Sequence, residues 1–321
     1  MRSSIGLTLL LIARLLLSGA EGSTIAAPDS SIVRGSDEFE FVYRVTLPEI
    51  KGDARLWIPL AKTDAFQTVT QEKFDIPIRW EKVHDRDYGN DICVLYPESG
   101  DSGKTVELRY LVVRKEKSAY SANGNEVARF LQPEKLVPIN QTFKTLAEQA
   151  TAGKTDDLDR AKALYDHVLG QMHYDKSGAG WGRGDAVYAC DARTGNCSDF
   201  HAYFIALARG IGIPARFAIG ATIPTDKNEG EIEGYHCWAE FFADGRWVPV
   251  DISEAWKNPD LAGYYFGHNP ANRFELTKGR DLIVDPAPAS GPINFLAYPL
   301  LEMNGTVVKP QASFAFRRIH A

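Results

Sequence analysis

Cysteine is scarce in this sequence. The 321 residues include four cysteines, at positions 93, 190, 197 and 237. Small secreted domains held together by disulfides have a much higher density of cysteine, so that class is excluded. No C-x-x-C pair is present either, which argues against a thioredoxin-like motif or a zinc site of common spacing. A disulfide between Cys190 and Cys237 stays open, because spacing alone does not decide pairing.

An excess of positive charge is also lacking. Lys and Arg number 36 against 42 Asp and Glu, which gives a formal net charge of -6. Without a basic surplus or a local basic cluster, we expect no nucleic-acid partner. The glycine-rich segment "SGAGWGRGD" at 177–185 does not match the phosphate-binding pattern G-x-x-x-x-G-K-[ST]. The sequence therefore predicts a soluble globular protein without a cofactor.

Long apolar runs are absent beyond the first residues. Ile5 to Leu17 is an apolar stretch of 13 residues, shorter than the about 20 that span a bilayer. Arg2 precedes it and the small residues Ser18–Ala20 follow it, as in a secretory signal. Arg14 interrupts the stretch, so an N-terminal helix or an uncleaved anchor stays open. We interpret residues 1–27 as a signal peptide and short linker, and we expect a periplasmic or secreted protein without a stable membrane span.

Signal cleavage makes a prediction about the mature chain. Its first residue should lie between about Ala20 and Pro28, because cleavage follows the small residues after the apolar stretch. N-terminal sequencing of the exported protein measures this position. An intact Met1 on a cytoplasmic protein would contradict the export hypothesis.

Two repeating patterns divide the rest of the sequence. Apolar and polar residues alternate between 37 and 117, as in "EFEFVYRVTL" and "TVELRYLVV", which predicts half-buried antiparallel strands. With their Pro and Gly turns, these strands favour a small β-sandwich over residues 28–118 that carries no candidate chemistry. Helical spacing follows, as in "DLDRAKALYDHVLGQMHY". We therefore assign 119–321 to a second domain, with a loop at 221–234 and strand-like runs in its tail.

One thiol stands at the start of a predicted helix. Cys197 follows the polar pair Gly195-Asn196 and precedes an apolar face with helical spacing. The face consists of Phe200, Tyr203, Phe204, Leu207 and Ile211. Unpaired N–H groups at a helix start stabilise a thiolate and also a developing oxyanion. A structural cysteine would more naturally lie on the apolar face in the middle of the helix, so Cys197 is a candidate nucleophile.

A predicted hairpin offers the partners that a nucleophilic cysteine needs. His236 lies in its first strand and Asp251 in its second, on either side of a turn at 243–245. This spacing places the two side chains within one or two rungs of each other, so the carboxylate can orient the imidazole. His201, four residues after Cys197 on the same helical face, is a rival base. It has no obvious carboxylate partner apart from the adjacent Asp199.

These segments carry a resemblance to a known family. "GNCSDFHAYFIALARGIGIPARFAIG", "GEIEGYHCWAEFF" and "RWVPVDISEAW" are similar to the transglutaminase-like superfamily in its bacterial exported branch, with the Cys-His-Asp order of papain-like enzymes. The resemblance covers about residues 133–319. It implies an α+β fold, in which a nucleophile helix packs on an antiparallel sheet and the small β-sandwich precedes this catalytic core.

The resemblance also implies roles for particular residues. Cys197 would be the nucleophile, His236 the base and acid, and Asp251 the orienting residue. A tryptophan helps to stabilise the oxyanion in animal transglutaminases, and Trp181 is the candidate here. The calcium-binding carboxylates of the animal enzymes have no recognisable counterpart. The family implies acyl transfer from amide or peptide bonds of a protein or peptide substrate, and we favour hydrolysis over cross-linking.

Other interpretations stay open at this stage. The chain could be a non-catalytic envelope module that binds peptides, or it could hold a metal or redox site built from Cys190, Cys197, Cys237 and His236. Against shared ligation, alternation along a strand points His236 and Cys237 to opposite faces. Gly263 to Phe266 and Arg273 are expected to form a rim of the site. The N-x-S/T matches at Asn140, Asn196 and Asn304 are interpreted as chance, and the sequence does not fix the oligomeric state.

Overall fold

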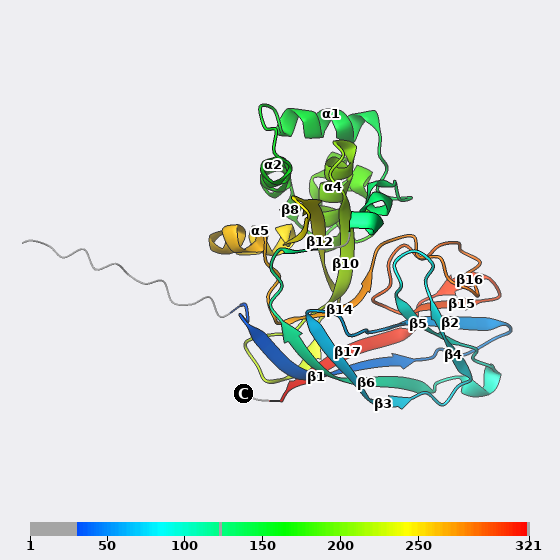
Figure 1. The fold of residues 1–321 in the computed structure, drawn as a ribbon. Helices are drawn as coiled ribbons and strands as arrows, with labels where there is room; N and C mark the ends of the chain where they lie inside the picture. Colours follow the sequence, from blue (N-terminus) through cyan, green and yellow to red (C-terminus); the bar gives the residue numbers. More distant parts are fainter. Residues whose placement is uncertain (1–30, 122–123, 320–321) are drawn as a thin grey trace, which may run out of the picture.

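The computed structural model describes residues 31–121 and 124–319. The predicted signal peptide at 1–27 lies outside these residues. Three five-stranded antiparallel sheets and one short parallel pair form the framework. Two of the sheets lie at one end of the molecule, and the third lies among the helices at the other end (Figure 1). The α+β fold expected from the sequence is confirmed.

The first two sheets pack on each other as a β-sandwich, because their apolar faces share one core. One sheet has the order β11 (Glu229–Ile232), β17 (Gln311–Arg318), β1 (Ser36–Thr46), β6 (Thr105–Lys115), β3 (Gln67–Asp75). The other has the order β16 (Thr306–Val308), β15 (Leu300–Met303), β2 (Ala54–Leu60), β5 (Asp91–Leu95), β4 (Trp80–His84). The predicted alternation is present in β6, where every second side chain is buried.

The sheets do not follow the predicted division at residue 118. Strand β17, from the end of the chain, pairs along β1, so that Phe41 lies opposite Phe316. Strand β11 lies in the segment predicted to be a loop at 221–234, and it pairs with β17 on the same sheet. In Figure 1 the blue β1 and the red β17 run side by side. The sandwich is therefore completed by late strands, and one of these, β11, comes from the middle of the predicted second domain.

The third sheet carries the helical layer. Its order is β14 (Arg273–Lys278), β10 (Ala215–Thr222), β12 (His236–Ala243), β13 (Arg246–Val250), β7 (Tyr120–Ser121). Helix α4 (Cys197–Gly210) packs on β12 and β10. The other helices are α1 (Gln141–Ala150), α2 (Asp157–Gln171), α3 (Ala186–Ala192), α5 (Ile252–Lys257) and α6 (Ala262–Tyr265), with the parallel pair β8 (His173–Tyr174) and β9 (Thr194–Gly195) beside them. None of the helices within residues 31–121 and 124–319 is long and apolar enough to cross a membrane.

The packing of α4 explains its sequence. Thirteen of its residues are buried, from Cys197 to Arg209, because α1, α2 and α3 cover the sides that do not face the sheet. Such a helix is apolar nearly all round, and burial of each large side chain contributes about 1.5–3 kcal/mol. The start of α4 is therefore held rigidly in the core. This rigidity fixes the position of the Cys197 thiol in the first turn of the helix.

Candidate active site

Helix α4 starts in a tightly built loop. The Asn196 side chain caps the helix by accepting a hydrogen bond from the Ser198 N–H at 3.0 Å, and the Asp199 carboxylate accepts one from the Asn196 N–H at 3.0 Å. This reciprocal arrangement is a capping box. A Cβ atom on Gly195 would lie 2.5 Å from the Cβ of Asp199, so only glycine fits there. The N–H of Cys197 is the first of the helix and has no acceptor within it.

The hairpin predicted from the sequence is formed by β12 and β13. Strands β12 and β13 pair so that Ala239 lies opposite Val250 and Ala243 opposite Arg246. The two residues between them, Asp244 and Gly245, both have positive φ, as the tight turn of a twisted hairpin requires. His236 at the start of β12 and Asp251 just after β13 consequently meet at the open end of the hairpin.

His236 and Asp251 form a short, buried pair. The Nε2 atom of His236 lies 2.6 Å from Oδ2 of Asp251, and the two residues are 6% and 0% exposed. Burial favours the neutral imidazole, but the charge of Asp251 and its hydrogen bond outweigh this and raise the pKa of His236 to about 9. Because Nε2 is occupied, Nδ1 is the nitrogen left to face the thiol.

Cys197 contacts this pair directly. Burial of its sulfur opposes ionisation, but hydrogen bonds with Cys237 and His236 and the charge of His236 together hold the pKa of Cys197 well below its usual value. The thiol is 2% exposed. The geometry therefore favours a thiolate–imidazolium pair, with Asp251 behind the imidazolium, as a nucleophilic cysteine requires.

The rival base, His201, contacts the hairpin and the start of α5, and its Nε2 also lies 3.8 Å from Asp251 Oδ1. Its Nε2 atom accepts a hydrogen bond from the N–H of Ile252 at 3.1 Å, and its Nδ1 atom lies 3.8 Å from the sulfur of Cys237. Burial is the main cause that lowers the pKa of His201. Both ring nitrogens are thus used to hold α4 against the hairpin, and a neutral His201 fits these contacts.

Arg273 belongs to the site, but not in the position predicted from the sequence. It was expected on a rim, but its guanidinium is buried behind the carboxylate, with Nη2 3.5 Å from Asp251 Oδ2 and 3.9 Å from Glu254 Oε2. Asp251 itself caps α5 by accepting from the Glu254 N–H at 3.1 Å. The charges of His236 and Arg273 outweigh burial and lower the pKa of Asp251. The carboxylate is therefore fixed in position and kept ionised.

The glycine-rich loop folds against the start of α4. Asp199 accepts hydrogen bonds from the N–H groups of Gly182 at 2.6 Å and Gly184 at 3.0 Å. Trp181, the candidate for oxyanion support, is half-buried next to Gly182. The loop is thus tied to the nucleophile helix through one carboxylate. A role for the Trp181 indole in binding an oxyanion stays a prediction.

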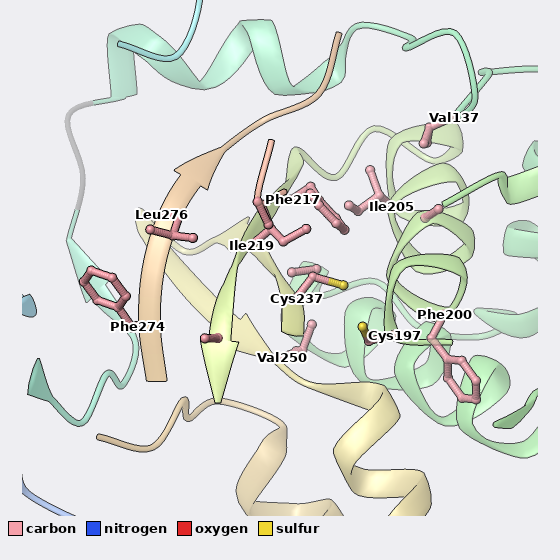
Figure 2. Close-up of a cluster of buried hydrophobic side chains, with 14 of the residues drawn as sticks. Val137, Cys197, Phe200, Ile205, Phe217, Ile219, Cys237, Val250, Phe274 and Leu276 are labelled. Atoms are coloured by element: carbon pink, nitrogen blue, oxygen red, sulfur yellow. The ribbon is translucent and has the colours of Figure 1, made fainter. Parts of the chain in front are cut away.

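The side chain of Cys237 is not separated from the site, contrary to the prediction from the sequence. Alternation was expected to separate it from His236, yet both side chains hydrogen-bond with Cys197. The thiol of Cys197 lies where β12 begins, and consecutive residues of the strand reach it there. Figure 2 shows the sulfur atoms of Cys197 and Cys237 in the same space between the helix and the strand. All four cysteines are free, so Cys190 and Cys237 are not bridged.

A polar cleft leads to His236. Its volume is about 400 Å³, and Tyr235, His236 and Glu254 lie on its wall. Strand β11 of the sandwich contributes Glu231 and Ile232 to its lining. The charged lining consists of Lys176, Lys227, Lys257, Asp226, Glu231, Glu233 and Glu254. A larger cavity of about 690 Å³ lies around Ser118 and Phe266 and does not include the Cys–His–Asp group.

The electrostatics predict a pH profile. We expect kcat/KM to be high at neutral pH and to fall as the pH rises through about 9, because His236 then loses the proton that it must give to the leaving group. On the acid side activity should fall only well below the usual thiol pKa of about 8.5. In Asp251→Asn the alkaline limb should move to lower pH, since the charge that raises the pKa of His236 is gone. A rate that only rises toward pH 9 would contradict the ion pair.

The sequence is similar to several known proteins. The model of the transglutaminase-like superfamily matches residues 144–252, the segment that holds Cys197, His236 and Asp251. An uncharacterized protein of Haemophilus influenzae is 25% identical, and the alignment covers 84% of this chain and 86% of that protein. The uncharacterized protein YebA of Bacillus subtilis is 26% identical over 49% of this chain and 22% of its own length.

A solved structure shares the fold. A protein of Cytophaga hutchinsonii named "Putative Cysteine Protease" superposes with a TM-score of 0.64, at 16% identity, over 89% of this chain and 92% of its own. The periplasmic domain of TgpA from Pseudomonas aeruginosa gives a TM-score of 0.40 at 15% identity, over 72% of this chain and 93% of its own. In the part of the chain that the structure describes, no group of three or more His, Cys, Asp or Glu side chains is placed to hold a metal ion.

Proposed function

We propose that this chain, which carries a transglutaminase-like domain over residues 144–252, is an exported cysteine enzyme that hydrolyses amide or peptide bonds through a thioester on Cys197. The observation that carries the proposal is the buried contact of Nε2 of His236 with Oδ2 of Asp251 at 2.6 Å, beside a thiol that hydrogen-bonds with the same imidazole. A module that only binds peptides has no need of a thiolate, an acid and an orienting carboxylate.

Acylation follows from the position of each group. The Cys197 thiolate attacks the substrate carbonyl carbon, and the N–H of Cys197 at the start of α4 can donate to the oxygen that becomes negative. Trp181 is the second candidate donor. The protonated His236 gives its Nδ1 proton to the leaving amine or ammonia, and a thioester remains on the sulfur. Asp251, held by Arg273, keeps the imidazole in the orientation that this transfer needs.

Water is the acceptor that the cleft favours. Neutral His236 can take a proton from a water molecule, which attacks the thioester and releases a carboxylic acid and the thiolate. Transfer to an amine instead requires a site that excludes water. The cleft beside His236 is lined by seven charged side chains, and charged groups favour a hydrated cleft over one that excludes water. This lining supports hydrolysis over cross-linking.

The sandwich supports the site from one side. Glu231 and Ile232 come from β11, which pairs with β17 of the sandwich sheet, and they line the cleft. A substrate bound there would touch both the sandwich and the start of α5 near Glu254. A peptide or protein chain is long enough to use both walls, which supports a peptide or protein substrate.

A substrate screen tests the function. Purified protein is incubated with a peptide library and with glutamine-containing peptides, each with and without a primary amine. We expect new peptide termini or released ammonia, with little amine incorporated. Amine incorporation that exceeds hydrolysis would reverse the preference for water. Peptide binding without any turnover would support the non-catalytic alternative.

A further inference from the structure

We propose that Cys197 and Cys237 form an oxidative modification site, in which a peroxide oxidises Cys197 and the neighbouring Cys237 captures the product as a reversible disulfide. The inference rests on the proposed function in one respect, since it uses the same reactive thiolate. It concerns a different reaction and assigns a role to Cys237, a thiol that the acyl-transfer steps do not use.

The contacts around Cys237 orient its proton toward Cys197. His201 Nε2 accepts a hydrogen bond from the Ile252 N–H at 3.1 Å, so in the neutral ring the hydrogen is on Nδ1. That Nδ1 lies 3.8 Å from the sulfur of Cys237, and the backbone carbonyl of Cys197 is a second acceptor for its hydrogen. A hydrogen bond with Cys197 raises the pKa of Cys237 and lowers that of Cys197, so the S–H of Cys237 donates to the Cys197 sulfur.

The two sulfur atoms face the same space. Cys197 begins α4 and Cys237 is the second residue of β12, and both side chains point into the space between these elements (Figure 2). They are 2% and 0% exposed, so Cys237 is the thiol that an oxidised Cys197 meets first. The other two cysteines cannot serve: Cys93 is buried in β5 of the sandwich, and Cys190 is on α3.

The chemistry balances in two steps. The Cys197 thiolate attacks a peroxide oxygen, the O–O bond breaks, and the sulfur becomes a sulfenic acid while the peroxide is reduced to water or an alcohol. The Cys237 sulfur then attacks the sulfenic sulfur, the S–O bond breaks, and hydroxide leaves with the Cys237 proton as water. A dithiol reductant restores both thiols by exchange. Without Cys237, further peroxide takes Cys197 to the irreversible sulfinic acid.

Peptide-mapping mass spectrometry of peroxide-treated protein tests the proposal. The wild type should lose two hydrogen atoms and yield a peptide pair linked through Cys197 and Cys237, and dithiothreitol should restore about nine-tenths of the free thiol. Cys237→Ala and Cys237→Ser should instead accumulate the sulfinic acid on Cys197, and dithiothreitol should restore less than about one-tenth. Cys190→Ala, which removes a thiol away from the pair, should behave as the wild type does.

The outcomes separate this proposal from the proposed function. If wild-type Cys197 reaches the sulfinic acid as fast as in Cys237→Ala and no linked peptide forms, the disulfide proposal is wrong and the reactive thiolate stands. If Cys197 resists both peroxide and iodoacetamide, both proposals fail together. The wild-type peptide map decides the matter even where a Cys237 variant does not fold.

Discussion

Replacing Cys197 by alanine is expected to reduce amide turnover by at least about 10⁴-fold, as loss of a catalytic nucleophile does in other hydrolases. Without the sulfur no thioester can form, and the remaining groups can only polarise a bound substrate. The fold should persist, since alanine is a good helix former at the first turn of α4. Steady-state rates on a substrate found in the screen measure the loss, and circular dichroism checks the fold.

Cys197→Ser is the matched variant for this change. It keeps a side chain of similar shape but replaces an easily ionised thiol by a hydroxyl that stays protonated at neutral pH. It should therefore lose nearly as much activity as Cys197→Ala. Full activity in either variant would overturn the acyl-transfer mechanism.

The second large effect distinguishes the two histidines near the thiol. His236→Ala should be nearly as severe as Cys197→Ala, because the thiolate loses its counter-ion and the leaving amine loses its acid. Asp251→Asn should retain a residual rate, since Asp251 orients the imidazole without touching substrate. The same change costs about 10⁴-fold in serine-protease triads, and we expect a smaller loss in a preformed Cys–His pair.

His201 provides the control for that comparison. His201→Ala leaves the Ile252 N–H without its acceptor, which costs about 1–3 kcal/mol of stability. His201→Gln offers an amide oxygen to the same N–H and should be milder. Both variants should lower activity only through packing. Thermal unfolding and kcat/KM measured together distinguish such an indirect loss from the loss of a catalytic base. A folded His201→Gln without activity, beside an active His236→Ala, would identify His201 as the base.

The sequence predicts the local parts of the site well. The polar pair Gly195-Asn196 and the apolar spacing after it place the start of a helix at Cys197, and this is where α4 begins. The two-residue turn of the hairpin sets the rung that brings Asp251 to His236. Both predictions depend on periodicity and turn residues over short stretches of the sequence. Such local patterns can be recognised without knowing how distant segments pair.

The parts that escape prediction depend on long-range pairing. Arg273 reaches Asp251 because β14 pairs with β10, with Arg273 opposite Thr222, and no local pattern reports that register. Cys237 reaches Cys197 because the start of α4 lies beside the start of β12. The predicted domain boundary at residue 118 did not anticipate that β17, near the end of the chain, pairs with β1. Alternation of apolar and polar residues identifies a strand but not the strand beside it.

The relative alkylation rates of the four cysteines test the central claim most directly. The wild-type protein is treated with a limiting amount of iodoacetamide near neutral pH, and the labelled positions are quantified by mass spectrometry. We predict that Cys197 reacts first, because its pKa is held well below its usual value, whereas burial raises the pKa of Cys93 to about 12. Faster labelling of Cys93 or Cys190 would contradict the account of Cys197 as an activated nucleophile.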